Sequence, residues 1–331
     1  LVESRHRGAI VVVDPQGRRR AAVGDVGQAV FPRSAVKAIQ ALPLVESGAA
    51  DRYGFGNAEL ALACSSHNGE PRHVTVASQM LAAAGRSVAD LECGPQVPSY
   101  RAAADDRVRA RVEPSAIHNN CSGKHAGFVC TACHLGEDPK GYVTPAHPVQ
   151  REIAATLAAL TGTALDAHNR AIDGCSIPTY AIPLDALALA FARLVTGEGL
   201  APGRAAAARR LVDACFAEPF MVAGTDRFCT DTMTRFGRRV FVKTGAEGVF
   251  CAAFPETGFG VALKCDDGAG RASETAMAAV IDAFLPMSEA ERAAYADRLH
   301  PPILSRVGAR VGEVRPVAEL VASLRDGRPV N

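Results

Sequence analysis

The order of strand-like and helix-like segments constrains the fold of this chain more than any other feature. Strand-like runs occupy the first 25 residues or so and return between residues 239 and 265, while the long middle is rich in helical patterns. Strands from the two chain ends pair most simply in one antiparallel sheet, with the middle packed against it. We therefore expect an α/β (α+β) fold, an antiparallel sheet flanked by helices with a helical lobe, and a ligand cleft between the lobes.

The individual segments follow from periodicity and turn signals. An apolar run at 8–13, the turn signal Asp14-Pro15-Gln16-Gly17 and a second run at 18–23 predict a β-hairpin. Further strands are expected at 239–243, 248–255 and 258–265, and helices at 35–47, 57–66, 70–84, 148–161, 183–196 and 272–284. We expect a single domain of residues 1–331, with a sheet lobe of about 1–50 and 235–331 and a helical lobe of about 51–234.

Composition excludes several classes of function. The net charge is +1 with charges mixed along the chain, which argues against nucleic-acid or membrane-surface binding and favours a small polar ligand. No apolar run approaches the roughly 18 to 20 residues that span a bilayer. Ten cysteines without a short regular spacing are typical of reduced thiols. We expect a cytoplasmic protein. The chain opens without Met, so removal of a leader peptide is the alternative.

Ser34-Ala35-Val36-Lys37 is the first candidate catalytic motif. A spacing of three residues at a helix start puts the serine and lysine about one turn apart on one face. A lysine with a lowered pKa can take the proton of a serine hydroxyl and make it a nucleophile. The alternative is an ordinary helix-capping serine beside a solvated lysine, because this four-residue pattern is common by chance.

A second motif follows in the expected order. Val242-Lys243-Thr244-Gly245 ends a strand and precedes two more, the context in which penicillin-recognising enzymes place a lysine beside their nucleophile. Their third motif, Ser-Asp-Asn, is absent between the two, where Cys64-Ser65-Ser66-His67 stands instead. Ser66 is a candidate partner for Lys243, or it caps a turn before Asn68-Gly69.

Two further blocks make a resemblance specific, Asn119 to His125 (NNCSGKH) and Asp173 to Ser176 (DGCS). With the motifs above, from about Arg33 to Asp267, the chain resembles the rhizobial-type L-asparaginases, also called thermolabile or class 3. The resemblance implies a fold like that of serine β-lactamases and glutaminases, and a homodimer. It implies hydrolysis of L-asparagine to L-aspartate and ammonia by two Ser-Lys tandems, Ser34 with Lys37 and Ser66 with Lys243.

The resemblance also assigns roles to residues. Ser34 is expected to be the nucleophile and Lys37 its base, with Ser66 and Lys243 relaying protons or stabilising the tetrahedral intermediate. The family's zinc site falls on Cys121, Lys124 and Cys175. Two thiolates suit zinc, whereas a lysine ligand has to be neutral, and composition alone favours His125 in its place. Two simply buried thiols are the alternative.

Polar residues around these motifs suit a small zwitterion, which needs several fixed partners. We assign substrate binding to Asn120, His125 and Asp173, and to Arg33, for which a surface position is the alternative. Cys130-Thr131-Ala132-Cys133-His134 fits a haem-attachment pattern without a leader or haem pocket, so core thiols are the simpler interpretation. The competing functions are a glutaminase or β-lactamase-like acyl hydrolase, and a non-catalytic metal- or haem-binding protein.

Overall fold

A five-stranded antiparallel sheet organises the chain, in the order β2-β1-β9-β8-β7. The computed structural model describes residues 1–326; the last five residues of the expected domain lie outside this range. The strands are β1 (Gly8–Val13), β2 (Arg19–Val23), β7 (Phe241–Thr244), β8 (Val249–Phe254) and β9 (Phe259–Cys265). The N-terminal strand β1 pairs with β9, which confirms a sheet built from both chain ends.

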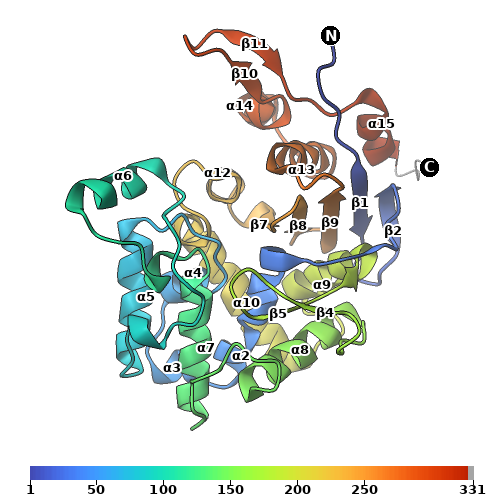
Figure 1. Cartoon of the computed structure of the whole chain (residues 1–331). Coiled ribbons are helices and arrows are strands. Elements are labelled where there is room, and N and C mark those ends of the chain that lie inside the picture. Colours follow the sequence, from blue (N-terminus) through green and yellow to red (C-terminus); the bar gives the residue numbers. More distant parts are fainter. Residues whose placement is uncertain (327–331) are drawn as a thin grey trace.

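Helices cover both faces of this sheet (Figure 1). On one face lies α9 (Leu184–Thr196), which contacts β1, β8 and β9, and on the other lies α13 (Gly270–Phe284). Every residue of β8 is buried, as expected for a strand between two helical layers. A Cβ at Gly260 of β9 would lie 1.9 Å from the carbonyl oxygen of Ala188, so glycine lets α9 approach the sheet closely.

The remaining helices form the lobe beside the sheet and its outer layer. They are α1 (Lys37–Gln40), α2 (Leu42–Glu46), α3 (Ala49–Arg52), α4 (Asn57–Ala63), α5 (Pro71–Ala83), α6 (Arg101–Ala110), α7 (Ser122–His134), α8 (Pro148–Thr161), α10 (Pro202–Ala217), α11 (Pro219–Val222), α12 (Phe228–Phe236), α14 (Glu289–Leu299) and α15 (Ala318–Asp326). The short 3-10 helices are η1 (Arg33–Val36), η2 (Val88–Asp90), η3 (Ala116–His118) and η4 (Gly237–Arg239). The mixed α/β class is thereby confirmed.

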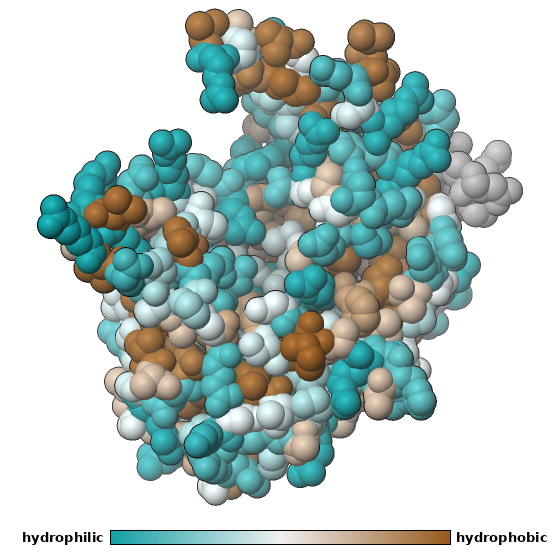
Figure 2. All heavy atoms as spheres, in the orientation of Figure 1, coloured by the Kyte–Doolittle hydropathy of each residue, from teal (hydrophilic) through white to brown (hydrophobic). Residues whose placement is uncertain are grey.

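Six shorter strands form three small two-stranded pairs. They are β3 (Ala29–Val30) with β6 (Ile182–Pro183), β4 (Arg170–Ile172) with β5 (Pro178–Tyr180), and β10 (Pro302–Leu304) with β11 (Arg310–Glu313). The β10–β11 hairpin projects from the body, and Figure 2 shows apolar side chains gathered on it. Its exposed apolar residues are Ile303, Leu304, Val307 and Val311. No helix in residues 1–326 combines the length and the apolar character that a membrane crossing needs.

One expected helix, 35–47, is interrupted. The segment starts as η1, continues as α1 and restarts as α2 after Ala41. Pro43 is the physical reason, because it has no backbone N–H to bond to the preceding turn and its ring crowds that turn's carbonyl. The α2 helix packs against α7, α8 and α10, so the segment after residue 36 contacts the helices of the middle of the chain rather than the sheet.

Candidate active site

Lys243 and Ser66 form a directly bonded serine-lysine pair. Lys243 lies in β7 with 1% of its surface exposed, and its Nζ is 2.9 Å from Ser66 Oγ. The same nitrogen is 3.0 Å from the carbonyl oxygen of Thr244. Burial, with the nearby charge of Lys37, lowers the pKa of Lys243 from its ordinary 10.5 to about 7. At neutral pH a large fraction of this amine is therefore uncharged and able to accept a proton.

The neighbouring pair, Ser34 and Lys37, has a different geometry. Ser34 is in η1 and half-buried, whereas Lys37 is 1% exposed and points inward. Within residues 1–326 no hydrogen bond joins the side chains of Ser34 and Lys37, although the backbone N–H of Lys37 donates to the carbonyl oxygen of Ser34. Lys37 Nζ is 2.6 Å from the carbonyl oxygen of Ser65 and 3.3 Å from that of Asn120. Burial is the main cause that lowers the pKa of Lys37. The Lys37 amine is thus directed at these two carbonyls, and its interaction with Cys121 partly offsets the effect of burial on its pKa.

A cleft of about 490 Å³ is lined in part by Arg33, the residue before Ser34. It is lined by Gln28, Ala29, Val30, Phe31, Arg33, Glu247, Val249, Lys264 and Asp266. Arg33 and Glu247, on opposite sides of the catalytic motifs in sequence, have φ values of 51° and 55°, a left-handed conformation that costs energy in residues other than glycine. Such strain collects at functional sites, and here it flanks both Ser34 and the strand that carries Lys243.

Three of the sequence-predicted residues, Cys121, Lys124 and Cys175, meet in the interior. Lys124 Nζ is 3.2 Å from Cys175 Sγ, and the two sulfurs lie close enough to shift each other's pKa. The contact with Cys175, together with the nearby charges of Lys37 and Lys124, lowers the pKa of Cys121 well below its usual value despite burial, while the contact with Cys121 raises the pKa of Cys175. Cys121 is therefore the more acidic of the two thiols.

This donor set fits zinc. Two thiols and an amine converge in a buried place, and binding a metal would release protons from the Cys175 thiol and the Lys124 ammonium. Burial lowers the pKa of Lys124, but the sulfurs of Cys175 and Cys121 outweigh it and raise the pKa overall. Over the described part of the chain, no three His, Cys, Asp or Glu side chains cluster to hold a metal.

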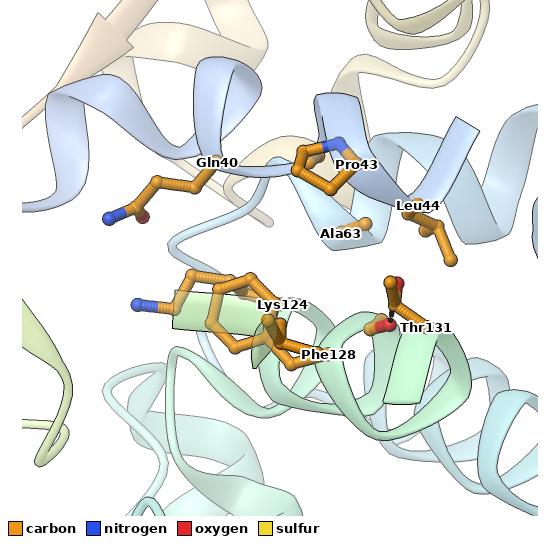
Figure 3. Close-up of a pocket in the computed structure, with 10 residues that line it drawn as sticks. Gln40, Pro43, Leu44, Ala63, Lys124, Phe128 and Thr131 are labelled. Atoms are coloured by element: carbon orange, nitrogen blue, oxygen red, sulfur yellow. Dashed lines mark hydrogen bonds between the residues drawn. The ribbon is translucent and has the colours of Figure 1, made fainter. Parts of the chain in front are cut away.

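The stem of Lys124 is held by apolar neighbours. Figure 3 shows a small pocket between the segment of α1 and α2 and helix α7, in which the polar ends of Gln40 and Lys124 point to the same side. Lys124 Nζ also lies 5.7 Å from the centre of the Phe128 ring. Gln40 Oε1 is buried without a hydrogen-bond partner within the described residues. The packing fixes the direction of the amine and leaves one acceptor beside it.

The proposed substrate-binding residues are in two places. Arg33 Nε and Nη2 both lie 3.1 Å from Asp173 Oδ1, so these two side chains join the Ser34 turn to the segment of Cys175. Within residues 1–326 the other N–H groups of Arg33 make no hydrogen bond, and Arg33 lines the cleft. Asn120 accepts a hydrogen bond from the Cys121 thiol at 3.0 Å. Arg33, Asp173 and Asn120 thus surround the two motifs, and their contact with substrate stays a prediction.

His125 is the most enclosed of the predicted residues, with no exposed surface. Its Nδ1 is 2.6 Å from the Tyr142 hydroxyl, which also accepts a hydrogen bond from the backbone N–H of Glu92 at 2.8 Å. The other ring nitrogen of His125, Nε2, has no hydrogen-bond partner within residues 1–326. Burial lowers the pKa of His125 well below its usual value, so the ring is neutral.

Two residues missing from the sequence prediction support the Ser66 loop. His67 Nδ1 accepts from the N–H of Gly69 at 3.0 Å, and its Nε2 is 2.9 Å from Ser122 Oγ, which ties this loop to the start of α7. Arg227 Nη1 is 3.3 Å from the carbonyl oxygen of Ser66 and 3.0 Å from Asn68 Oδ1. Arg227 has no motif around it in the sequence, so only its position in space reveals it.

The side chains of the haem-like motif, Cys130 to His134, form hydrogen bonds with residues outside this site. Cys130 Sγ donates to the carbonyl oxygen of Met80 at 3.3 Å, and Cys133 accepts from Arg86 at 3.3 Å. His134 Nε2 donates to the carbonyl oxygen of Ser47 at 2.8 Å. All three side chains are thus engaged in contacts that stabilise α7 against its neighbours.

A serine is thus hydrogen-bonded to a buried amine of lowered pKa, at the edge of an antiparallel sheet between helices. This arrangement is typical of the active site of a serine-dependent hydrolase. The family model of L-asparaginase II matches residues 1–316, and the chain belongs to this family. It is therefore an asparaginase-type hydrolase. The resemblance drawn from the motifs is confirmed at the level of this family.

Two other comparisons complete this picture. No curated protein sequence matches the chain. Among solved structures, a β-lactamase from Mycobacterium bovis is 14% identical, with 87% of this chain and 94% of that chain covered and a TM-score of 0.36. At this score the description of the fold rests on the strand order and helix packing of the chain itself.

Proposed function

We propose that this chain is an L-asparagine amidohydrolase that forms L-aspartate and ammonia through an acyl-enzyme. The observation that carries the proposal is the Ser66–Lys243 contact of 2.9 Å, with a lysine whose pKa is lowered to about 7, beside a second serine and lysine. Membership of the asparaginase family supports the reaction class. A base with a pKa near neutrality is the most effective for moving protons at neutral pH.

Ser34 is the proposed nucleophile. It is the more accessible of the two serines, because Ser34 is half-buried and follows Arg33, which lines the cleft, whereas Ser66 is 5% exposed. Its Oγ attacks the side-chain amide carbon of asparagine while Lys37 takes the hydroxyl proton. The C–N bond then breaks and the nitrogen leaves as ammonia after receiving a proton. Contacts such as Ser34 to Lys37 commonly tighten only when substrate binds.

The second half of the reaction uses water. Water attacks the β-aspartyl ester carbon, the bond to Ser34 Oγ breaks, and aspartate leaves with the serine hydroxyl restored. Ser66 and Lys243 relay protons in both halves, because the hydroxyl and the amine already share a hydrogen bond. Arg33, Asn120, His125 and Asp173 are the proposed partners of the substrate's charged ends.

Cys121, Lys124 and Cys175 are the proposed zinc ligands. A bound zinc ion supplies a Lewis acid and an open position for water at such a site. The chain's own contribution is to hold two sulfurs and one amine together in a buried place before the metal arrives. A homodimer and a cytoplasmic location also stay predictions from the sequence.

The test is ammonia release from asparagine and from glutamine, beside hydrolysis of a chromogenic β-lactam. We expect turnover of asparagine well above that of the other two. Preferential turnover of glutamine or of the β-lactam would support the corresponding alternative instead. No hydrolysis of any of them, with bound metal or haem found by elemental analysis and absorbance, would favour a binding protein.

A further inference from the structure

We infer that Arg227 is a positioning residue for the Ser66–Lys243 pair. The inference rests on the proposed function in taking this pair as part of the catalytic machinery. Arg227 is half-buried at the start of α12, and its guanidinium reaches the loop that carries Ser66. It touches the backbone of Ser66 rather than its hydroxyl, so it acts through this serine.

The contacts made by Arg227 bridge two points of one loop. Its Nη1 donates to the carbonyl oxygen of Ser66 at 3.3 Å and to Asn68 Oδ1 at 3.0 Å. Ser66 in turn donates its backbone N–H to the carbonyl oxygen of Val222 at 2.9 Å. The peptide groups on both sides of the Ser66 side chain are therefore fixed, and the hydroxyl is aimed at Lys243.

Both polar atoms of the Asn68 side chain have further hydrogen-bond partners, and these restrict the movement of the residue that Arg227 contacts. Its Oδ1 accepts from Ser99 Oγ at 3.1 Å, and its Nδ2 donates to the carbonyl oxygen of Thr225 at 2.9 Å and to Glu70 Oε1 at 3.2 Å. Glu70 also accepts from the backbone N–H and the hydroxyl of Thr225 at 2.8 and 2.6 Å. A network with all its members satisfied is stiffer than its separate bonds suggest.

A glycine in the same place shows how closely the parts approach. Gly224 has a φ of 109°, and a Cβ there would lie 2.4 Å from Glu70 Oε1 and 2.8 Å from Asn68 Nδ2. Only glycine combines this backbone conformation with this close approach. The segment that leads into Arg227 therefore packs closely against Glu70 and against Asn68, and the guanidinium contacts the second of these.

The charge of Arg227 has a second consequence, on Lys243. Burial is the largest cause of the lowered pKa of this lysine, and the positive charges of Lys37 and Arg227 add to it. The titratable or charged groups that face Lys243 are Lys37, Arg227, Cys121, Cys215, Cys229 and Cys251. A fixed cation among them favours the neutral amine, because a second positive charge nearby costs energy.

The experiment compares Arg227→Gln and Arg227→Lys with the wild-type chain, and uses Arg235→Gln as the matched control. Arg235 is on the same helix but pairs with Asp231 at 3.3 Å. The measurements are the pH dependence of kcat/KM on asparagine, kcat itself, the Tm, and the titration of Lys243 by carbon-13 NMR of labelled lysine. The chain has only five lysines, so the signal of Lys243 is assignable with a Lys243→Met variant.

For Arg227→Gln we expect kcat to fall roughly tenfold, since the serine loses its fixed position. We also expect the acid limb of the profile and the NMR titration of Lys243 to move upward by about half a pH unit or more. Arg227→Lys keeps the charge, so the titration stays near that of the wild type. Its kcat still falls severalfold, because an ammonium on a different stem does not match both acceptors.

An unchanged kcat and an unchanged titration of Lys243 in folded Arg227→Gln would overturn the inference, as would an equal shift in Arg235→Gln. If Arg227→Gln does not fold, a wild-type kcat in Arg227→Lys overturns it. The NMR titration does not depend on the substrate. Lack of asparagine hydrolysis by the wild type therefore contradicts the proposed function alone, and the effect of Arg227 on Lys243 is still decided.

Discussion

The amine of Lys243 lies 2.9 Å from the hydroxyl of Ser66, although 177 residues separate them in the chain. The lysine comes from β7 in the central sheet and the serine from the loop after α4 in the helical part. Both are almost wholly buried. A buried lysine without a carboxylate partner is costly to the fold, and its retention beside a serine is what a proton-transfer role predicts.

Replacement of Lys243 by Met separates this role from stability. We expect kcat/KM to fall about 10²- to 10⁴-fold, the usual contribution of a general base. The Tm should rise by a few degrees, since a methionine of similar length avoids the cost of burying an amine. Both are measured on the purified variant, by ammonia release and by thermal unfolding. Activity close to that of the wild type would contradict the role of Lys243.

Replacement of Ser34 and replacement of Ser66 should affect the rate of ammonia release differently. Ser34→Ala removes the proposed nucleophile and should abolish ammonia release, whereas Ser66→Ala should retain a residual rate because another donor can replace a relay. Ser47→Ala is the control, since the hydroxyl of this half-buried serine accepts a hydrogen bond only from the backbone N–H of Ala49, at 3.3 Å, within the described residues. Near-normal turnover by Ser34→Ala, with a normal Tm, would refute its assignment.

The pH dependence follows from the direction of the Lys243 shift. The pKa is lowered from 10.5 to about 7, so below about pH 7 the amine is protonated and cannot act as a base. We expect log kcat/KM to fall with a slope of one below that pH, and the limb to be lost in Lys243→Met. Unfolded chains bind this proton up to about pH 10.5, so its contribution to stability improves from pH 7 to 10.5. A flat profile between about pH 5.5 and 8 would contradict this assignment.

Zinc binding should depend on the thiols of Cys121 and Cys175 and not on the other thiols. We expect Cys121→Ser and Cys175→Ser to copurify with much less zinc than the wild type, because a neutral hydroxyl is a poor substitute for a thiolate. Cys130→Ser is the control, a buried thiol bonded to the backbone of Met80. Metal content by atomic emission is the readout. Equal zinc in all four proteins would show that the metal, if bound, is elsewhere.

Gly260→Ala tests the seating of α9 on the sheet. A Cβ there would lie 1.9 Å from the carbonyl oxygen of Ala188 and 2.5 Å from the backbone nitrogen of Ala192, both backbone atoms that cannot turn aside. We expect a loss of about 3 kcal/mol or more in the free energy of unfolding. In contrast Gly203→Ala, in α10 with no atom within 4 Å, should gain about 0.5 to 1 kcal/mol. The free energy of unfolding of both variants is measured with denaturant. Equal values for the two variants would contradict the close packing of α9 on the sheet.

Local sequence patterns predicted the helices and strands well where their formation depends on residues close together in the chain. The hairpin of β1 and β2, the helix at 148–161 and the strands β7 to β9 all follow from alternation, turns and helical spacing. The helix expected at 35–47 is the main failure. A single proline, Pro43, outweighs a good apolar pattern because it removes a hydrogen bond inside the helix.

The motifs were enough to select the candidate catalytic and metal-binding residues, since the serines, lysines and cysteines of these blocks stand out by type and spacing. Tertiary structure alone decided their partners. Only folding brings Ser66 to Lys243, turns Lys37 to the carbonyls of Ser65 and Asn120, and adds Arg227 from a stretch without a motif. Hydrogen bonds and pKa values depend on distances of a few ångströms between segments far apart in sequence, and only the packed fold sets those distances.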